Sequence, residues 1–245
     1  MQTQIQFDEI IAILGSLKQE RAKGLKKTGV FSEQEIEFLI KLTYDLTDKD
    51  FEYFVAILLE RDGYKTQVQG GFNDHGIDIL ATKDGKTFAI QCKQWSKGYI
   101  TMGNVGEYYG KIYAEKEKNL DKIFAYVTTS YIQPEAENFL INHGIQGPIS
   151  NLKLVRESKK LGYFSEEGWK GVIIEIRRRR FEEMRKNPQL TFETGYEKLK
   201  FELRTARLNE FKHHLPRNIR YKKSIINLIR HKEFLNNFFQ YWDLA

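Results

Sequence analysis

The segment IDILATKDGKTFAIQCK, from Ile77 to Lys93, alternates between two kinds of side chain on either side of Asp84-Gly85. Apolar residues occupy every second position before and after that pair, which is the pattern of a half-buried strand. An Asp-Gly pair between two such runs is a strong signal for a two-residue hairpin turn. With these two residues as the loop, Asp78 lies directly opposite Gln91. The segment therefore predicts an antiparallel hairpin and, around it, a β-sheet.

The two faces of this hairpin carry different side chains. One face is apolar throughout and is expected to lie against the core; its residues are Ile77, Ile79, Ala81, Phe88, Ile90 and Cys92. The other face carries Asp78, Gln91 and Lys93 among small or apolar neighbours. Directly opposed Cβ atoms are about 4.5–5.5 Å apart, so the Asp78 carboxylate and the Gln91 amide oxygen can share one hard cation. Lys93, one pleat further along, can bind a phosphate or a water held by that cation.

An ordinary ion pair between Asp78 and Lys93 on a solvated face is the simpler interpretation of this pattern. The preceding loop, residues 70–76, favours the functional interpretation because it contains three glycines and an aspartate. Such a loop lets a ligand approach the backbone closely. Cys92 alternates toward the core, so we expect a buried small hydrophobic side chain there rather than a nucleophile.

The rest of the chain predicts helices packed on both faces of a mixed sheet, an α/β fold. Before the hairpin we expect two helices within residues 1–48, separated by a basic stretch at 21–27, and a third from Thr47-Asp48 to Arg61. Glu52 lies about 90° from the centre of the apolar stripe of that third helix, so it can lean over the rim of the sheet. Further strands are expected at 64–69 and 123–127 and within 149–155, and further helices at 102–116 and 133–143 and beyond residue 160.

The composition fits a folded protein with one sizeable α/β domain and a smaller appendage. The 245 residues are 41% hydrophobic and 29% charged and include only four prolines, which excludes wholesale disorder. A single cysteine excludes a disulfide framework and a cysteine-rich zinc site. The N-terminus lacks the pattern of a signal peptide, and no apolar run is long enough for a membrane span. We therefore expect a cytoplasmic protein that does not act in a membrane.

The positive charge of the chain lies in its last third. Residues 1–160 carry 21 Lys and Arg against 22 Asp and Glu, whereas residues 161–245 carry 18 against 11, a net charge of +7. A basic segment is the usual electrostatic footprint of a protein that binds phosphate backbones, although a solvated helix surface gives the same pattern. Two basic runs are therefore candidates for contact with a nucleic acid; they contain Arg177, Arg178, Arg179, Arg180, Arg217, Arg220, Lys222 and Lys223.

Several groups of residues, taken in order, resemble the catalytic domain of the Mrr-type restriction endonucleases. The groups are Asp50-Phe51-Glu52, Gly70-Gly71-Phe72-Asn73-Asp74-His75-Gly76-Ile77-Asp78-Ile79, Ile90-Gln91-Cys92-Lys93, Val105-Gly106-Glu107-Tyr108-Tyr109-Gly110, and Val127-Thr128-Thr129-Ser130 with Pro134-Glu135-Ala136. These enzymes belong to the PD-(D/E)xK nuclease superfamily, in the branch where Gln replaces the acidic residue before x-Lys. The resemblance covers about residues 48–150. It implies a restriction-endonuclease-like mixed β-sheet flanked by helices.

The family resemblance also implies a metal-dependent phosphodiesterase that acts on DNA. Asp78, Gln91 and Glu52 would hold Mg²⁺, for which Mn²⁺ can substitute, with the Cys92 carbonyl as a further ligand. Lys93 would orient or help to deprotonate the attacking water and stabilise the pentacovalent phosphate. Charge neutralisation at the phosphate and an activated water are what the hydrolysis of a phosphodiester requires.

Three residues near the predicted site are further candidates for contact with DNA: His75, Thr129 and Ser130. A polar role within the loop is the alternative for His75. Capping of the next turn is the alternative for Thr129 and Ser130. Trp95, just after the hairpin, is either a groove contact or part of the packing at the rim.

The sequence divides into an N-terminal helical segment at 1–48, a nuclease domain at 49–160 and a basic helical region at 161–245. Mg²⁺-dependent cleavage of foreign DNA is the function that this arrangement predicts. A structure-specific nuclease, such as a junction resolvase or a transposon-end cutter, has overlapping motif patterns and stays open as an alternative. A catalytically silent nucleic-acid-binding module is a third interpretation, although such a relic is expected to have lost one of the motif groups. Cleavage of both DNA strands by a single-site domain favours a homodimer.

Overall fold

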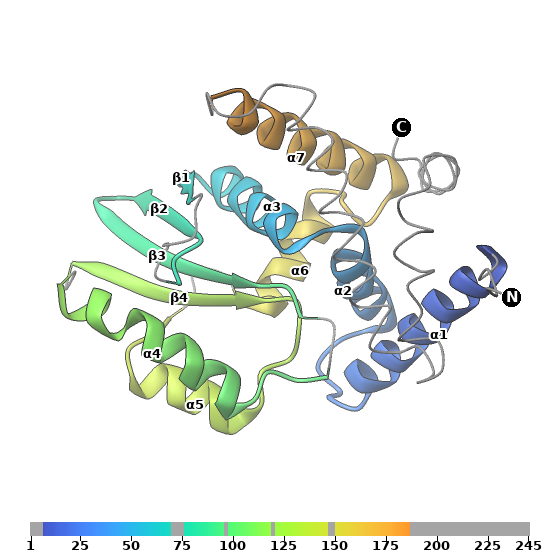
Figure 1. Ribbon diagram of the computed structural model, residues 1–245, viewed down its shortest axis with the longest axis horizontal. Helices are drawn as coiled ribbons and strands as arrows, with labels where there is room; N and C mark the ends of the chain where they lie inside the picture. The colour runs from blue at the N-terminus through green and yellow to red at the C-terminus, as the bar shows by residue number, and fades with distance from the viewer. Residues whose placement is uncertain (1–6, 70–75, 96–97, 119–120, 147–149, 187–245) are drawn as a thin grey trace, which may run out of the picture. The chain divides into compact units, whose positions relative to one another are not determined.

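The computed structural model describes residues 7–69, 76–95, 98–118, 121–146 and 150–186 (Figure 1). Residues 21–191 form one compact unit, and residues 1–20 with 192–245 belong to a second. The hairpin predicted above lies wholly in the first unit. None of the described helices has the length and apolar character that a membrane span needs.

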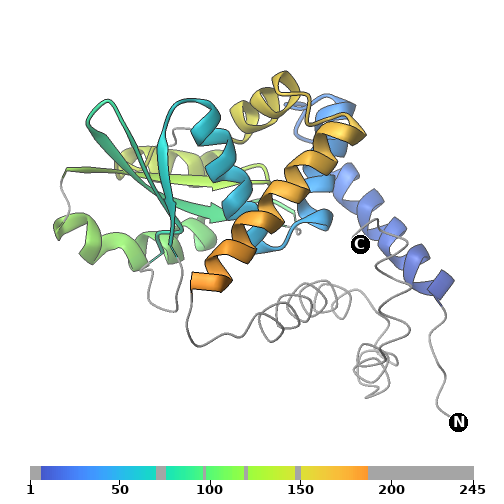
Figure 2. The same cartoon turned by 90° about the horizontal axis from the view of Figure 1, so that it is seen from above.

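A four-stranded mixed sheet forms the centre of the first unit. Its strands, in order across the sheet, are β1 (Lys65–Val68), β2 (Ile79–Lys83), β3 (Lys86–Lys93) and β4 (Lys122–Thr128). β1 pairs antiparallel with β2, and β2 with β3, whereas β4 runs parallel to β3. Helix α3 (Asp48–Arg61) covers one face of the sheet, and α4 (Met102–Lys118) and α5 (Pro134–Asn142) cover the other (Figures 1 and 2). The prediction of a mixed sheet flanked by helices is therefore confirmed.

The hairpin has the turn and the register that the sequence predicts. Asp84 and Gly85 both have positive φ angles, 50° and 73°, as a type I′ turn requires. Ile79 lies opposite Ile90, and the backbone N–H of Asp78 donates to the carbonyl of Ile90 at 2.8 Å. This register places Asp78 beside the end of β3, where Gln91 and Cys92 follow one another.

The face of the hairpin that was expected to carry the polar residues is covered by helices. Ala89 is completely buried there, in a cluster with side chains of α4, α5 and β4. Ile77 belongs to the same cluster, whereas the alternation predicted it beside Ile79 on the other face. Gly76, with φ at +79°, turns the chain just before this point, so the strand alternation does not extend back to Ile77. The candidate site consequently lies at the end of the sheet and not on an open face.

Two capped helices precede the sheet. Ser32 and Glu35 form a capping box at the start of α2 (Glu33–Asp45). Thr47 and Asp50 form a second capping box at the start of α3. Side-chain oxygens thus satisfy backbone N–H groups that a first helical turn leaves unpaired. This cap fixes the start of α3, and with it the orientation of the side chains on its first turns.

Helix α6 (Asn151–Lys160) takes the place of the strand predicted within 149–155, so that prediction is wrong. The Ser150 hydroxyl caps the helix by accepting a hydrogen bond from a backbone N–H three residues further on. Leu154 and Val155 are completely buried, and the helix contacts α2 and α3. The cap and this apolar contact outweigh the strand propensity of a short run.

Helix α1 (Phe7–Lys26) continues through most of the basic stretch at 21–27, which the sequence predicted as a break. Arg21 and Leu25, one helical turn apart, are both buried. Arg21 donates to the carbonyl of Thr129 at 3.0 Å. The helix continues because Arg21 and Leu25, within the basic run, are buried in the compact unit of residues 21–191.

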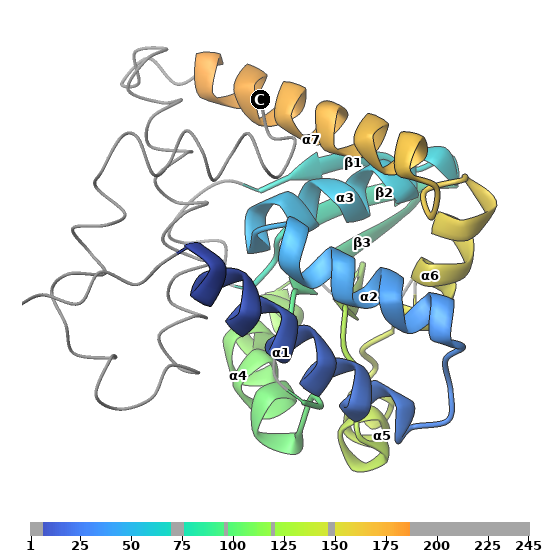
Figure 3. The same cartoon turned by 90° about the vertical axis from the view of Figure 1, so that its right-hand side faces the viewer.

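Helix α7 (Glu166–Lys186) packs on α3 (Figure 3). Its apolar residues Trp169, Val172 and Ile176 lie at helical spacing and are buried, and Ile173 is half-buried. The boundaries expected at residues 48 and 160 both fall inside the compact unit, because α2 contacts α6 and α7 contacts α3. The division of the chain into three functional segments stays a prediction.

Candidate active site

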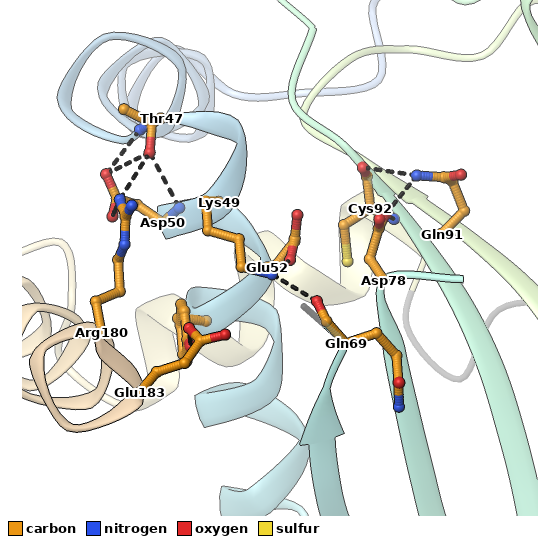
Figure 4. Close-up of polar contacts among 11 residues, drawn as sticks. Thr47, Lys49, Asp50, Glu52, Gln69, Asp78, Gln91, Cys92, Arg180 and Glu183 are labelled. Carbon is orange, nitrogen blue, oxygen red and sulfur yellow. Dashed lines mark hydrogen bonds and ion pairs between the residues drawn. The ribbon is translucent and has the colours of Figure 1, made fainter. Parts of the chain in front are cut away.

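The candidate site lies where the end of β3 approaches the start of α3 (Figure 4). Asp78 precedes β2, Gln91 and Cys92 lie at the end of β3, and Glu52 lies on α3. Figure 4 shows the Asp78 and Gln91 side chains in contact, with the Glu52 carboxylate on the side of α3 that faces them. The fold thus brings the four predicted metal ligands to one end of the sheet.

Asp78 is the buried carboxylate of this group, with 7% of the residue exposed. Its Oδ2 atom accepts a hydrogen bond from the backbone N–H of Cys92 at 2.6 Å and another from the side-chain amide of Gln91. Bonds from N–H groups offset part of the cost of burying a charge. The carboxylate is therefore held against the end of β3, and the backbone of that strand sets its position.

The Gln91 amide lies between two oxygen acceptors. Its Nε2 atom donates to Asp78 Oδ2 and, at 3.3 Å, to the carbonyl oxygen of Cys92. A half-turn of the amide exchanges Nε2 for Oε1 and brings a carboxylate, an amide and a carbonyl oxygen together. Mg²⁺ and Ca²⁺ prefer such oxygen ligands. These groups therefore fit a divalent cation.

The site is not one that carboxylates and imidazoles alone would form. In the part of the chain that the structure describes, no group of three or more His, Cys, Asp or Glu side chains is placed to hold a metal ion. Two of the candidate ligands here are instead an amide and a backbone carbonyl, from Gln91 and Cys92. A neutral amide leaves the site less negative than a second carboxylate would, so we expect a weakly held metal ion.

Glu52 approaches the site from α3, with 13% of its side chain exposed. The Lys49 ammonium pairs with Glu52 Oε2 at 2.7 Å and donates to the carbonyl of Gln69 at 2.6 Å. The backbone N–H of Gln69 in turn donates to the carbonyl of Asp78 at 2.7 Å. Lys49 thus links α3 to Gln69, whose backbone is hydrogen-bonded to that of Asp78. Sequence reasoning missed Lys49, although a lysine three residues before a glutamate on a helix signals an ion pair.

Cys92 is a buried free thiol, as predicted. Burial raises the pKa of the thiol well above its usual value, and the carboxylates of Asp78 and Glu52 raise it further. The thiol is therefore not activated as a nucleophile. Cys92 instead contacts the candidate site through its backbone. Its N–H donates a hydrogen bond to Asp78, and its carbonyl accepts one from the Gln91 amide.

Lys93 is exposed at the end of β3. Its Nζ atom lies 5.7 Å from the centre of the Trp95 ring. The Lys111 ammonium and, more weakly, that of Lys93 hold the pKa of Glu107 below its usual value. Lys93 is thus a solvent-accessible cation two residues after Gln91 on β3, where a phosphate can reach it.

Thr129 and Ser130 are completely buried and hold the segment that follows β3. The Thr129 hydroxyl accepts a bond from the backbone N–H of Trp95 at 2.9 Å, and the Ser130 hydroxyl donates to the carbonyl of Gly98 at 2.5 Å. Because both side chains are buried, the predicted contact of these two residues with DNA has no support in the structure. Trp95 packs at the edge of the cluster under α4 and α5, which favours packing at the rim over a groove contact.

Gln94 is a second residue that sequence reasoning did not single out. Its side-chain amide donates to the carbonyls of Leu42 and Thr43, at 3.0 and 2.8 Å, and to that of Leu46. The last turn of a helix leaves such carbonyls without helical partners. Gln94 therefore anchors the residue directly after Lys93 to the C-terminal end of α2.

The arginine run at 177–180 is largely engaged in ion pairs within the unit. Arg178 pairs with glutamates of α7 itself, whereas Arg179 and Arg180 pair with carboxylates of α3. Arg180 is buried, with 8% of the residue exposed, so its predicted contact with DNA has no support in the structure. Arg179 and Arg180 instead fasten α7 to α3. DNA contacts of Arg177 and Arg178 stay predictions.

The remaining predicted DNA contacts lie outside the described residues. They are His75, Arg217, Arg220, Lys222 and Lys223. Their roles rest on the sequence alone and stay predictions.

Comparison with known proteins identifies the segment that contains this site. Residues 43–156 match the model of a family described as restriction endonuclease. Among curated proteins, none matches the sequence. The matched segment includes the whole sheet and each of the four candidate metal ligands.

Three solved structures resemble the chain. A protein of unknown function, AF1548, has 21% identity and a TM-score of 0.40 over 47% of this chain and 68% of its own. The MspJI restriction endonuclease, solved with a 27-mer oligonucleotide, has 16% identity and a TM-score of 0.41 over 56% of this chain and 33% of its own. The DNA modification-dependent restriction endonuclease AspBHI has 14% identity and a TM-score of 0.45 over 63% of this chain and 42% of its own. The similarity thus spans about a third of one of these chains and about two thirds of another.

Proposed function

Since residues 43–156 belong to the Mrr-type restriction endonuclease family, we propose that the protein is a Mg²⁺-dependent endonuclease that hydrolyses foreign DNA. The observation that carries the proposal is the meeting of the Asp78 carboxylate, the Gln91 amide and the Cys92 carbonyl at the end of β3. Restriction endonuclease folds generally use divalent metal ions. Oxygen ligands of this kind favour Mg²⁺, and Mn²⁺ accepts the same ligands.

The candidate residues divide the work of phosphodiester hydrolysis. A divalent cation bound here supplies charge neutralisation at the phosphate and a more acidic water. Asp78 is held ready by the Cys92 N–H, and Gln91 presents its amide oxygen after a half-turn. Glu52 brings a second carboxylate from α3. Lys93 donates to a phosphate oxygen and orients the water that attacks phosphorus as the P–O bond to the leaving group breaks.

Affinity for DNA comes from the basic region in this proposal. Asp78 and Glu52 repel phosphate before a cation binds. Residues 161–245, with a net charge of +7, supply the attraction, chiefly through the run at 217–223 together with Arg177 and Arg178. Cleavage of both strands with one site per chain favours a homodimer. Foreign DNA is met in the cytoplasm, where we place the protein.

Cleavage of plasmid DNA with Mg²⁺ or with a chelator tests the proposal. Asp78→Asn keeps an oxygen that accepts the Cys92 N–H, so it should preserve the fold while lowering cleavage by more than about 100-fold. Lys93→Met should have a similar effect. Lys86→Met is the matched control, because Lys86 lies on the same strand but beside the hairpin turn, and it should cleave like the wild type. Wild-type cleavage by either site variant, with the fold checked by circular dichroism, contradicts the proposal.

A further inference from the structure

Lys49 places a positive charge inside the candidate site. Its side chain is 28% exposed, and its ammonium lies 2.7 Å from Glu52 Oε2 and 2.6 Å from the carbonyl oxygen of Gln69. The centre of the Tyr53 ring is 5.9 Å from the same nitrogen. A carboxylate, a carbonyl and an aromatic ring therefore hold the side chain in one position instead of leaving it extended into solvent.

Each carboxylate of the site has its own donor. Asp78 accepts from the Cys92 N–H and the Gln91 amide, whereas Glu52 accepts from Lys49. Burying two carboxylates in a largely buried site costs free energy unless opposite charges or N–H groups compensate their negative charge. Lys49 supplies for Glu52 the positive charge that a bound metal ion would otherwise supply.

We propose that Lys49 is a resident counter-cation that competes with the divalent metal ion for Glu52 and so sets the metal affinity of the site. This inference rests on the proposed function. A metal ion that approaches Glu52 meets the positive charge of an ammonium paired with the same carboxylate, and the two cations repel each other. Metal binding is therefore weak until DNA arrives, because a phosphate offers the metal ion a further ligand and Lys49 a new partner.

Calorimetric titration of the protein with Mn²⁺, in the absence of DNA, tests this role. Lys49→Gln keeps a side-chain donor but removes the charge, so it should bind Mn²⁺ about tenfold more tightly, equivalent to about 1.4 kcal/mol. Lys49→Arg keeps the charge and should bind like the wild type. Lys26→Gln is the matched control, because Lys26 also pairs with a glutamate at 2.7 Å, in that case Glu33. Its Mn²⁺ affinity should equal that of the wild type.

A double-mutant comparison isolates the contact. In a Glu52→Gln background, Lys49→Gln should raise Mn²⁺ affinity by much less than in the wild type, because the carboxylate for which the two cations compete is gone. Equal or weaker binding by Lys49→Gln in the wild-type background overturns the inference. Lys49→Met replaces that variant if it does not fold, with the same gain expected.

Asp78→Asn in the same titration separates this inference from the proposed function. If Asp78→Asn abolishes Mn²⁺ binding while Lys49→Gln leaves the affinity unchanged, only the role of Lys49 is wrong. If neither the wild type nor Lys49→Gln binds Mn²⁺, the inference and the metal site of the proposed function are both wrong.

Discussion

Arg180 of α7 pairs with Asp50 of α3, with Nη1 2.8 Å from Oδ1 and neither side chain more than 10% exposed. Asp50 also belongs to the cap of α3, where its Oδ2 atom accepts from the Thr47 hydroxyl at 2.7 Å. The family match ends at residue 156, so this pair joins a helix beyond it to the first turn of the helix that carries Glu52. Helix α7 is thus part of what holds the candidate site in place.

Arg180→Met should destabilise the protein strongly. It leaves the buried Asp50 carboxylate without its cation, and the loss of one partner of a buried ion pair typically lowers the free energy of unfolding by about 3–5 kcal/mol. Urea denaturation followed by circular dichroism measures this change. Arg178→Gln is the control from the same run and should have little effect, because exposed ion pairs contribute little. Equal losses in both variants would show that burial of the Arg180–Asp50 pair does not matter.

Gln91→Glu should make the stability of the protein depend on metal. The substitution replaces the donor between two acceptors by a second carboxylate, so the melting temperature without metal should fall below that of the wild type. Mn²⁺ should then raise the melting temperature of this variant by several degrees more than it raises that of the wild type, and cleavage should persist. Gln91→Ala should lose metal-dependent cleavage. Wild-type Mn²⁺ affinity in Gln91→Ala would mean that Gln91 is not a ligand.

Acid should weaken the docking of α7 through Glu60. Burial raises the pKa of Glu60, but hydrogen bonds from Arg179 and Thr66 outweigh that effect and hold the pKa below its usual value. The carboxylate therefore contributes stability above about pH 4.5, and that contribution is lost as the pH falls through the pKa of the folded state. The difference in unfolding free energy between the wild type and Glu60→Gln should be largest above about pH 5 and shrink toward about pH 3. A constant difference would contradict this, and the exposed Glu166→Gln serves as the control.

Neutralising the basic run at 217–223 should weaken DNA binding for all sequences alike. Replacement of Arg217, Arg220, Lys222 and Lys223 by Gln should lower the slope of log K against log salt by about 0.9 for each phosphate that the protein no longer neutralises. Fluorescence anisotropy at several salt concentrations measures the slope. If affinity and slope stay at wild-type values while the oligomeric mass by ultracentrifugation changes, this region serves assembly and not DNA binding.

The hairpin could be predicted because its information is local. Asp84 and Gly85 set the turn, and the alternation of side chains sets the register, so the pairing follows from residues 77–93 alone. The helix at 151–160 could not be predicted in the same way, because a short apolar run fits either a strand or a helix. Its contacts with α2 and α3, which are distant in sequence from it, decide between the two.

The partners of the charges could not be predicted from the sequence either. Lys49 contacts the carbonyl of Gln69, 20 positions away, and Arg180 contacts Asp50, 130 positions away. A count of residues gives the net charge of the last third of the chain. It does not show which of its cationic side chains form ion pairs with carboxylates inside the fold. The run at 177–180 therefore looked like a surface for DNA, although two of its arginines reach the carboxylates of α3.

The single cysteine of the chain has its thiol in the interior and its backbone in the candidate site. Because the chain has no other thiol, a thiol-specific reagent can modify the protein only at Cys92, and only when the end of β3 opens. The rate of modification therefore measures how often the end of β3 opens. A cation that bridges the Cys92 carbonyl and the Asp78 carboxylate should lower the rate of Cys92 modification. The wild-type sequence therefore already contains a chemical reporter of metal binding.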